Sequence, residues 1–301
     1  MQFRLALCLL PLAAQAAQAA QAARIVSSND DGWAEKNLHT IYDALTSSGH
    51  DVVVSAPAQD KSGTGSSDEA PTKLTRPCEF NSCPAGSPPT GYDANNPRFF
   101  YVNSFPVTSM RYGIQTVAPK FFSSPPELAV AGPNVGANLG RTVQISGTVG
   151  AATEAALEGI PAIAFSGSVG RATPFWDATP TYSQVYAQLS AQIVDTLLQG
   201  GKPVLPNGIF LNVNFGAVSG SECTRASDFS FVLTRILDAS WNAPADVEIC
   251  DNGGRLPTET DVVRSDGCYV SISVATARDK RDASASAQQF VLNKLASILS
   301  C

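Results

Sequence analysis

Short apolar runs alternate with helical patterns along the first two thirds of the chain. The apolar run at 24–26 is followed by leucine and isoleucine at helical spacing over 35–48, and then by a second buried run at 51–56. Gly49 stands where the C-terminal cap of that helix is expected. This strand–helix–strand order predicts two parallel strands joined by a right-handed crossover. The pattern therefore predicts an α/β fold built on a mainly parallel sheet.

The same reading extends through the rest of the chain. Further strands are expected at 99–103, 128–132, 162–167 and 209–214, and helices at 110–117, 144–157, 181–199 and 284–299. Residues 69–98 are rich in Pro, Gly, Asn and Cys, and predict a long insertion with little regular structure. Two β-rich segments, 229–237 and 269–275, follow the last of these strands. We expect them to form hairpin arms outside the main sheet.

The first 22 residues differ from everything that follows them. Arg4 gives a weakly positive start, an apolar run covers 5–12, and repeated Ala-Gln-Ala triplets offer small-residue cleavage sites. This is the pattern of a secretory signal peptide, and it is too short to span a membrane. We expect residues 1–22 to be a signal peptide of an exported protein. Residues 23–301 are expected to form one domain, with a core at about 24–215 and a β-rich C-terminal extension at about 216–301.

The composition narrows the classes of partner. With 44% hydrophobic and 15% charged residues among 301, the chain is globular rather than disordered. A formal net charge of −6 without basic clusters argues against a nucleic-acid polymer or an anionic membrane as partner. A small phosphate ester is still compatible, because it needs only local positive potential.

The cysteines also indicate export. Six follow the signal segment: Cys78, Cys83, Cys223, Cys250, Cys268 and Cys301. An even number in an exported chain predicts disulfides. Cys78 and Cys83 enclose a short loop and form the one pair that we predict. The pairing of the other four is left open, and no Cys-x-x-Cys pair is present to suggest zinc.

Two adjacent carboxylates, Asp30 and Asp31, follow the first strand and are themselves followed by Gly32. The carboxyl ends of parallel strands face the ligand crevice of an open α/β sheet, and Gly32 supplies the chain break that lets both carboxylates converge. Without a basic partner, such a pair repels unless it shares a proton or binds a cation. An oxygen-rich site of this kind suits Mg²⁺ or Mn²⁺. An Asx-type turn that caps the next helix is an alternative reading.

Other strand ends carry related chemistry. A loop dense in hydroxyls and glycines follows the second strand at 59–67, and two asparagines with three glycines occupy 133–140. The helix after Ser146 begins among hydroxyls, which makes its N-terminus a natural anion site or simply a capped helix end. The only histidines are His39 and His50, so the chain offers few residues from which to build a Ser-His-Asp triad or a histidine-ligated metal site.

These blocks together resemble the SurE family of survival-protein phosphatases and nucleotidases. The resemblance rests on Ser28-Asn29-Asp30-Asp31-Gly32, Ala56-Pro57 with Ser62-Gly63, Gly132-Pro133-Asn134 with Gly136-Ala137-Asn138-Leu139-Gly140, and Ser146-Gly147-Thr148-Val149. It implies a Rossmann-like three-layer α/β sandwich with a C-terminal β-hairpin and helix extension that makes homodimers or homotetramers. It also implies a divalent-metal-dependent phosphomonoesterase that acts on nucleoside monophosphates and other small phosphate esters.

The resemblance also implies roles for particular residues. Its metal ligands fall on Asp30, Asp31, Ser62 and Asn134, its active-site asparagine on Asn138, and its hydroxyl-bearing phosphate contacts on Ser146 and Thr148. We also expect Asp30 to be catalytic, by orienting or deprotonating the attacking water. Asn138 and Gly147 are expected to join Ser146 and Thr148 in binding the substrate. The segment after Gly32 departs from the family's usual pattern, which bears on substrate range. The alternative is an exported, non-catalytic protein that captures nucleotides or phosphate. The residues leave open the preferred ester, the choice between Mg²⁺ and Mn²⁺, the oligomeric state and the signal cleavage site.

Overall fold

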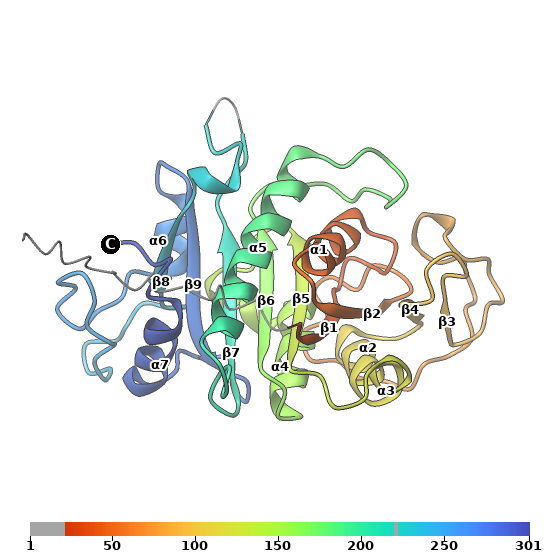
Figure 1. Ribbon diagram of the computed structural model, residues 1–301, viewed down its shortest axis with the longest axis horizontal. Helices are drawn as coiled ribbons and strands as arrows, with labels where there is room; N and C mark the ends of the chain where they lie inside the picture. Colours follow the sequence, from red (N-terminus) through yellow and green to blue (C-terminus); the bar gives the residue numbers. More distant parts are fainter. Residues whose placement is uncertain (1–21, 220–221) are drawn as a thin grey trace, which may run out of the picture.

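The computed structural model describes residues 22–219 and 222–301. In these residues nine strands form one sheet, in the order β3-β4-β2-β1-β5-β6-β7-β9-β8, which runs from right to left in Figure 1. The strands are β1 (Arg24–Ser28), β2 (Asp51–Pro57), β3 (Thr90–Tyr92), β4 (Phe99–Val102), β5 (Leu128–Val135), β6 (Ala162–Gly167), β7 (Ile209–Phe215), β8 (Ser230–Thr234) and β9 (Tyr269–Thr276). Six neighbouring strands of the sheet run parallel, namely β4, β2, β1, β5, β6 and β7. β3 pairs antiparallel with β4, and β9 pairs antiparallel with β7. The predicted α/β class with a mainly parallel sheet is confirmed.

Helices cover both faces of this sheet. They are α1 (Lys36–Ser47), α2 (Pro106–Tyr112), α3 (Ala118–Phe121), α4 (Gly147–Leu157), α5 (Thr181–Gln199), α6 (Glu259–Arg264) and α7 (Ala285–Leu295). Side chains of α1, α5 and α7 share one core with Ile25 of β1, whereas α2, α3 and α4 share a second core with the next residue, Val26. Successive strand residues point to opposite faces, so each strand supplies both cores. The result is the three-layer arrangement expected from the sequence.

Two predicted elements differ from the structure near the β3 edge. The helix expected at 110–117 begins earlier, at Pro106, and continues through a π turn at Gly113–Val117 into α3. Proline favours the first helical turn, where its missing N–H costs nothing, so Pro106 marks the start. The insertion at 69–98 contains β3, a three-residue edge strand that is too short to leave a periodic pattern.

The prediction that the C-terminal β-rich segments form hairpin arms outside the main sheet is wrong. β8 and β9 join the main sheet, and because they run parallel to each other they form no hairpin. Ser271 and Ser273 alternate with apolar residues along β9, which imitates a half-exposed strand. Both serines are nevertheless fully buried, because their hydroxyls have partners inside the protein. Ser273 bonds with the side chains of Thr234 and Glu259, and Ser271 Oγ lies 3.4 Å from the backbone oxygen of Asn214.

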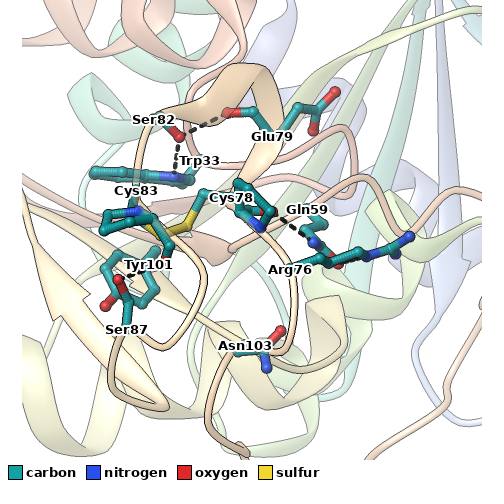
Figure 2. The surroundings of a disulfide bond; sticks show 12 residues. Trp33, Gln59, Arg76, Cys78, Glu79, Ser82, Cys83, Ser87, Tyr101 and Asn103 are labelled. Atoms are coloured by element: carbon teal, nitrogen blue, oxygen red, sulfur yellow. Dashed lines mark hydrogen bonds between the residues drawn. A yellow bond between two sulfur atoms is a disulfide. The ribbon is translucent and has the colours of Figure 1, made fainter.

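Three disulfides lie in the described chain. The predicted Cys78–Cys83 bond is confirmed, and the remaining cysteines pair as Cys223–Cys268 and Cys250–Cys301. Figure 2 shows the first of these, which closes the turn that follows Arg76. Trp33 Nε1 donates to Ser82 Oγ at 2.9 Å, which ties this turn to the loop after β1.

Both histidines have structural roles. The His39 ring stacks between Phe99 and Phe175, with both pairs of ring centroids 4.1 Å apart, and its Nε2 lies 3.1 Å from Trp33 O. Burial lowers the pKa of His39 from 6.5 to about 4. His50 pairs with Asp195 at 2.8 Å.

The burial of His39 predicts a loss of stability in acid. The unfolded chain protonates His39 near pH 6.5 while the folded chain does so near pH 4, so the stability that neutral His39 contributes falls as pH drops through this window. We expect His39→Phe, which cannot titrate, to lose less of its thermal midpoint than the wild type between pH 7 and pH 4. Thermal unfolding followed by circular dichroism at both pH values measures this. Equal losses in the two proteins would contradict the prediction.

The expected signal peptide at residues 1–22 lies, apart from Ala22, outside the described residues. In the part of the chain that the structure describes, no helix combines the length and the apolar character needed to cross a bilayer.

Candidate functional site

Asn29, rather than either aspartate, makes the side-chain hydrogen bonds of the turn after β1. Asn29 Nδ2 donates to Gly32 O at 2.8 Å, and Asn29 Oδ1 accepts the Gly32 N–H at 3.3 Å. Gly32 has a φ of +110°, which glycine tolerates best. The Asx-type turn considered from the sequence is therefore present, but Asn29 makes it. Helix α1 is capped by Glu35, and neither Asp30 nor Asp31 is used as a cap.

Asp30 lies against the first turn of α4. It is buried, and Thr148 Oγ1 donates to Asp30 Oδ1 at 2.5 Å. A Cβ added to Gly147 would lie 2.8 Å from Asp30 Cβ and 2.9 Å from Asp30 Oδ2. Glycine at this position thus allows the helix N-terminus, with its partial positive charge, to approach the carboxylate. The structure thus brings positions 30, 147 and 148 together.

Asp31 faces the end of β5. Its Oδ2 accepts the Val135 N–H at 3.0 Å, which places the carboxylate beside the segment that carries Asn134. Asn134 Nδ2 donates to Gly136 O at 2.6 Å. No donor among the described residues reaches Asn134 Oδ1, so this carbonyl oxygen is the end of the amide that remains for a ligand.

The loop after β2 reaches the same end of the sheet. The Lys61 N–H donates to Asp30 O at 2.7 Å. Ser62 therefore directly follows a residue that is hydrogen-bonded to Asp30. The Ser62 hydroxyl itself donates to Asp60 Oδ1 at 2.7 Å, and the residue is exposed. The structure therefore brings the loop that carries Ser62 to the backbone of Asp30, with the hydroxyl hydrogen of Ser62 directed to Asp60.

Asn138 is held from three directions. Its Nδ2 donates to Ser166 Oγ at 2.8 Å and lies 3.5 Å from Thr148 Oγ1, and its backbone N–H donates to Asn214 Oδ1 at 2.8 Å. Ser166 and Asn214 were not predicted as site residues. Each stands at or near the carboxyl end of a buried strand, β6 or β7, which is the same signal that singled out Asp30.

Ser146 caps helix α4. Its Oγ accepts the Val149 N–H at 3.1 Å, which is the helix-cap alternative left open by the sequence. The hydroxyls of Ser146 and Thr148 therefore both have partners within the protein. The first turn of α4 still directs its N-terminal partial charge toward the site.

The carboxylate pair is electrostatically unfavourable as it stands. Burial raises the pKa of Asp30, and hydrogen bonds from Thr148 oppose this increase. Burial also raises the pKa of Asp31 well above its usual range, and the charges of Asp30 and Glu35 raise it further. No Lys, Arg or His within residues 22–219 and 222–301 forms an ion pair with either carboxylate. The pair requires a proton or a cation to neutralise it.

The donor set fits a hard divalent ion. Asp30, Asp31, Ser62 and Asn134 offer only oxygen, which Mg²⁺ and Mn²⁺ accept. The described residues contain no group of three or more His, Cys, Asp or Glu side chains arranged to hold a metal. The proposed set has only two carboxylates and relies on neutral oxygens for the rest, which leaves room for water and a substrate oxygen.

Residues 25–243 match the family described as survival protein SurE. The chain belongs to the SurE family. An acid phosphatase of Yarrowia lipolytica is 36% identical to it over 298 residues, which cover 89% of this chain and 83% of the relative. A 5'-nucleotidase SurE of Lawsonia intracellularis is 31% identical over 195 residues, which cover 65% of this chain and 66% of the relative. The names acid phosphatase and 5'-nucleotidase both denote enzymes that hydrolyse phosphomonoesters.

A solved SurE structure has a similar fold. The crystal structure of the SurE protein from Aquifex aeolicus superposes with a TM-score of 0.58 at 25% identity, and the alignment covers 84% of this chain and 93% of that one. The family resemblance expected from the four sequence blocks is thereby confirmed.

Proposed function

We propose that the protein is a divalent-metal-dependent phosphomonoesterase that hydrolyses nucleoside monophosphates and other small phosphate esters. One observation carries the proposal: Asp30 and Asp31 are buried side by side and no cationic side chain of the described residues neutralises them. The names of the SurE relatives, acid phosphatase and 5'-nucleotidase, support the same reaction class.

Asp30, Asp31, Ser62 and Asn134 would hold the metal. Bound there, a divalent ion would supply positive charge opposite the phosphoryl oxygens and so stabilise the charge that develops on them. The free Asn134 Oδ1 and the unneutralised carboxylates are the features of this chain that support the assignment.

The protein groups around the pair would position the ester and the attacking water. Thr148 fixes the Asp30 carboxylate, which would orient the water and accept its proton. Asn138, whose amide is fixed by Ser166, would contact the phosphoryl oxygens. The N-terminus of α4 at Gly147 would add its partial positive charge to the same region.

Phosphate release from a panel of substrates tests this proposal. The panel comprises AMP, 3'-AMP, p-nitrophenyl phosphate and short polyphosphate, assayed with the metal-loaded protein. We expect release from at least the monoesters, and their relative rates would give the substrate preference. A folded protein that binds AMP and Mn²⁺ but releases no phosphate over hours would instead support the non-catalytic capture of nucleotides.

A further inference from the structure

Glu259 is a buried carboxyl residue that neither the proposed reaction nor the proposed metal site uses. It opens helix α6 and is fully buried. Three donors converge on it: the Gly140 N–H on Oε1 at 2.8 Å, and Asn212 Nδ2 and Ser273 Oγ on Oε2 at 2.9 and 2.8 Å. No ion pair among the described residues involves it. A buried carboxyl held only by neutral donors is costly to keep, which suggests that its hydrogen bonds have a specific use.

Those hydrogen bonds lead to the backbone of Asn138. Asn212 Nδ2, which donates to Glu259, also donates to Asn138 O at 3.0 Å. Asn214 Nδ2 donates to the same carbonyl at 3.2 Å, and Asn214 Oδ1 accepts the Asn138 N–H. Both backbone groups of Asn138 are thus fixed by side chains of β7, and Glu259 sets the orientation of one of these side chains.

The orientation of the Asn212 amide has a cost. Its Oδ1 is buried with no hydrogen-bond partner, although Nδ2 makes two bonds. Rotating the amide by half a turn would give Oδ1 no donor on the Glu259 side and would remove the bond to Asn138 O. The acceptor at Glu259 therefore selects the orientation that supports Asn138.

Glu259 also holds the other end of the same loop. Gly140, whose N–H it accepts, has a φ of +57° and begins the 3-10 turn Gly140–Gln144 that leads to the Ser146 cap of α4. One carboxyl therefore contacts the loop directly at Gly140 and indirectly, through Asn212, at Asn138.

We infer that Glu259 is a positioning residue, which fixes the loop 138–140 so that the Asn138 amide faces the reaction site. The inference rests on the proposed function, because it gives Asn138 its role there. Glu259 lies beyond residues 25–243, the part of the chain that matches the SurE family. The C-terminal segment, through α6 and β9, would thus contribute to the geometry of the site as well as to the sheet.

Kinetics of Glu259 variants test this role. We expect Glu259→Ala to lower kcat for p-nitrophenyl phosphate with Mn²⁺ by on the order of tenfold to 100-fold, with a smaller change in KM. Glu259→Gln keeps one acceptor oxygen but places an amide donor against a donor, so its kcat should lie between those of Glu259→Ala and the wild type. A kcat for Glu259→Ala within about twofold of the wild type, in folded protein, would overturn the inference.

A stability control separates positioning from general destabilisation. Leu295→Ala creates a cavity in the fully buried face of α7, in the same C-terminal segment but without a polar link to Asn138. We expect it to lower the thermal midpoint at least as much as Glu259→Ala while kcat at a temperature well below unfolding stays near that of the wild type. An equal loss of kcat in Leu295→Ala would contradict a positioning role.

Amide hydrogen exchange tests the inference independently of turnover. Exchange at Asn138 and Gly140, measured by NMR without substrate, should be faster in Glu259→Ala than in the wild type and unchanged in Leu295→Ala. If the wild type releases no phosphate, the proposed function fails, yet this exchange pattern would still support the contact between Glu259 and the loop. Unchanged protection at both amides in Glu259→Ala would overturn it.

Discussion

Replacing Asp30 by asparagine is expected to lower phosphate release by on the order of 10³-fold or more. Asparagine keeps the shape of the side chain and an oxygen that can accept the Thr148 hydroxyl. It removes the negative charge that the proposed metal requires and the base that would take a proton from water. Because Asp30 is buried without a cationic partner, losing its charge should not destabilise the metal-free fold.

The measurement is initial-rate phosphate release by Asp30→Asn and wild type at saturating Mn²⁺, with thermal midpoints of both metal-free proteins. Asp51→Asn is the matched control, because Asp51 is the first residue of β2 and pairs with Arg98. It lies at the amino end of its strand, whereas the site lies at the carboxyl ends. This control variant should retain the wild-type rate. A folded Asp30→Asn with near-wild-type turnover would contradict the role of Asp30 as metal ligand and base.

Adding a single methyl group at Gly147 is expected to lower kcat/KM by on the order of 10²-fold. The new Cβ in Gly147→Ala would lie within 2.9 Å of both Asp30 Cβ and Oδ2, so either the carboxylate or the first turn of α4 must move. Alanine is a better helix former than glycine by about 1 kcal/mol, so the helix itself gives no reason for a loss.

Gly159→Ala provides the control for this second change. A Cβ at Gly159 meets no atom within 4 Å, but the φ of +83° makes alanine unfavourable there. We expect Gly159→Ala to lower the thermal midpoint and keep its activity, and Gly147→Ala to show a larger loss of activity. Similar kcat/KM values for both variants would show that close approach of α4 to Asp30 is unimportant.

The part of the site that lies at strand ends could be predicted from the sequence. Asp30, Asn134 and Asn138 each follow a buried apolar run, and parallel strands place such residues at one edge of the sheet. The family blocks then singled out Thr148 and Gly147. The structure connects Asp30, Thr148 and Asn138 through side-chain contacts and sets Gly147 against Asp30. Asn134 lies next to Val135, whose N–H donates to Asp31.

The contributions of the C-terminal segment could not be predicted. Helix α6 has six residues and too little periodicity to be recognised, so nothing in the sequence indicates that Glu259 would be buried. The two β-rich segments predicted hairpin arms outside the sheet, whereas contacts such as those of Ser273 with Glu259 and Thr234 bury β9 within it. Long-range polar pairing of this kind leaves no local pattern. The homodimer or homotetramer and the export signal stay predictions.

The most direct test of the account is a metal titration of turnover. The protein is stripped with EDTA and dialysed, and phosphate release from p-nitrophenyl phosphate is followed as Mn²⁺ or Mg²⁺ is added back. We predict negligible release by the stripped protein and a saturable return of activity in the wild type, with no return in Asp30→Asn. Full turnover by the wild type in excess EDTA would contradict the account.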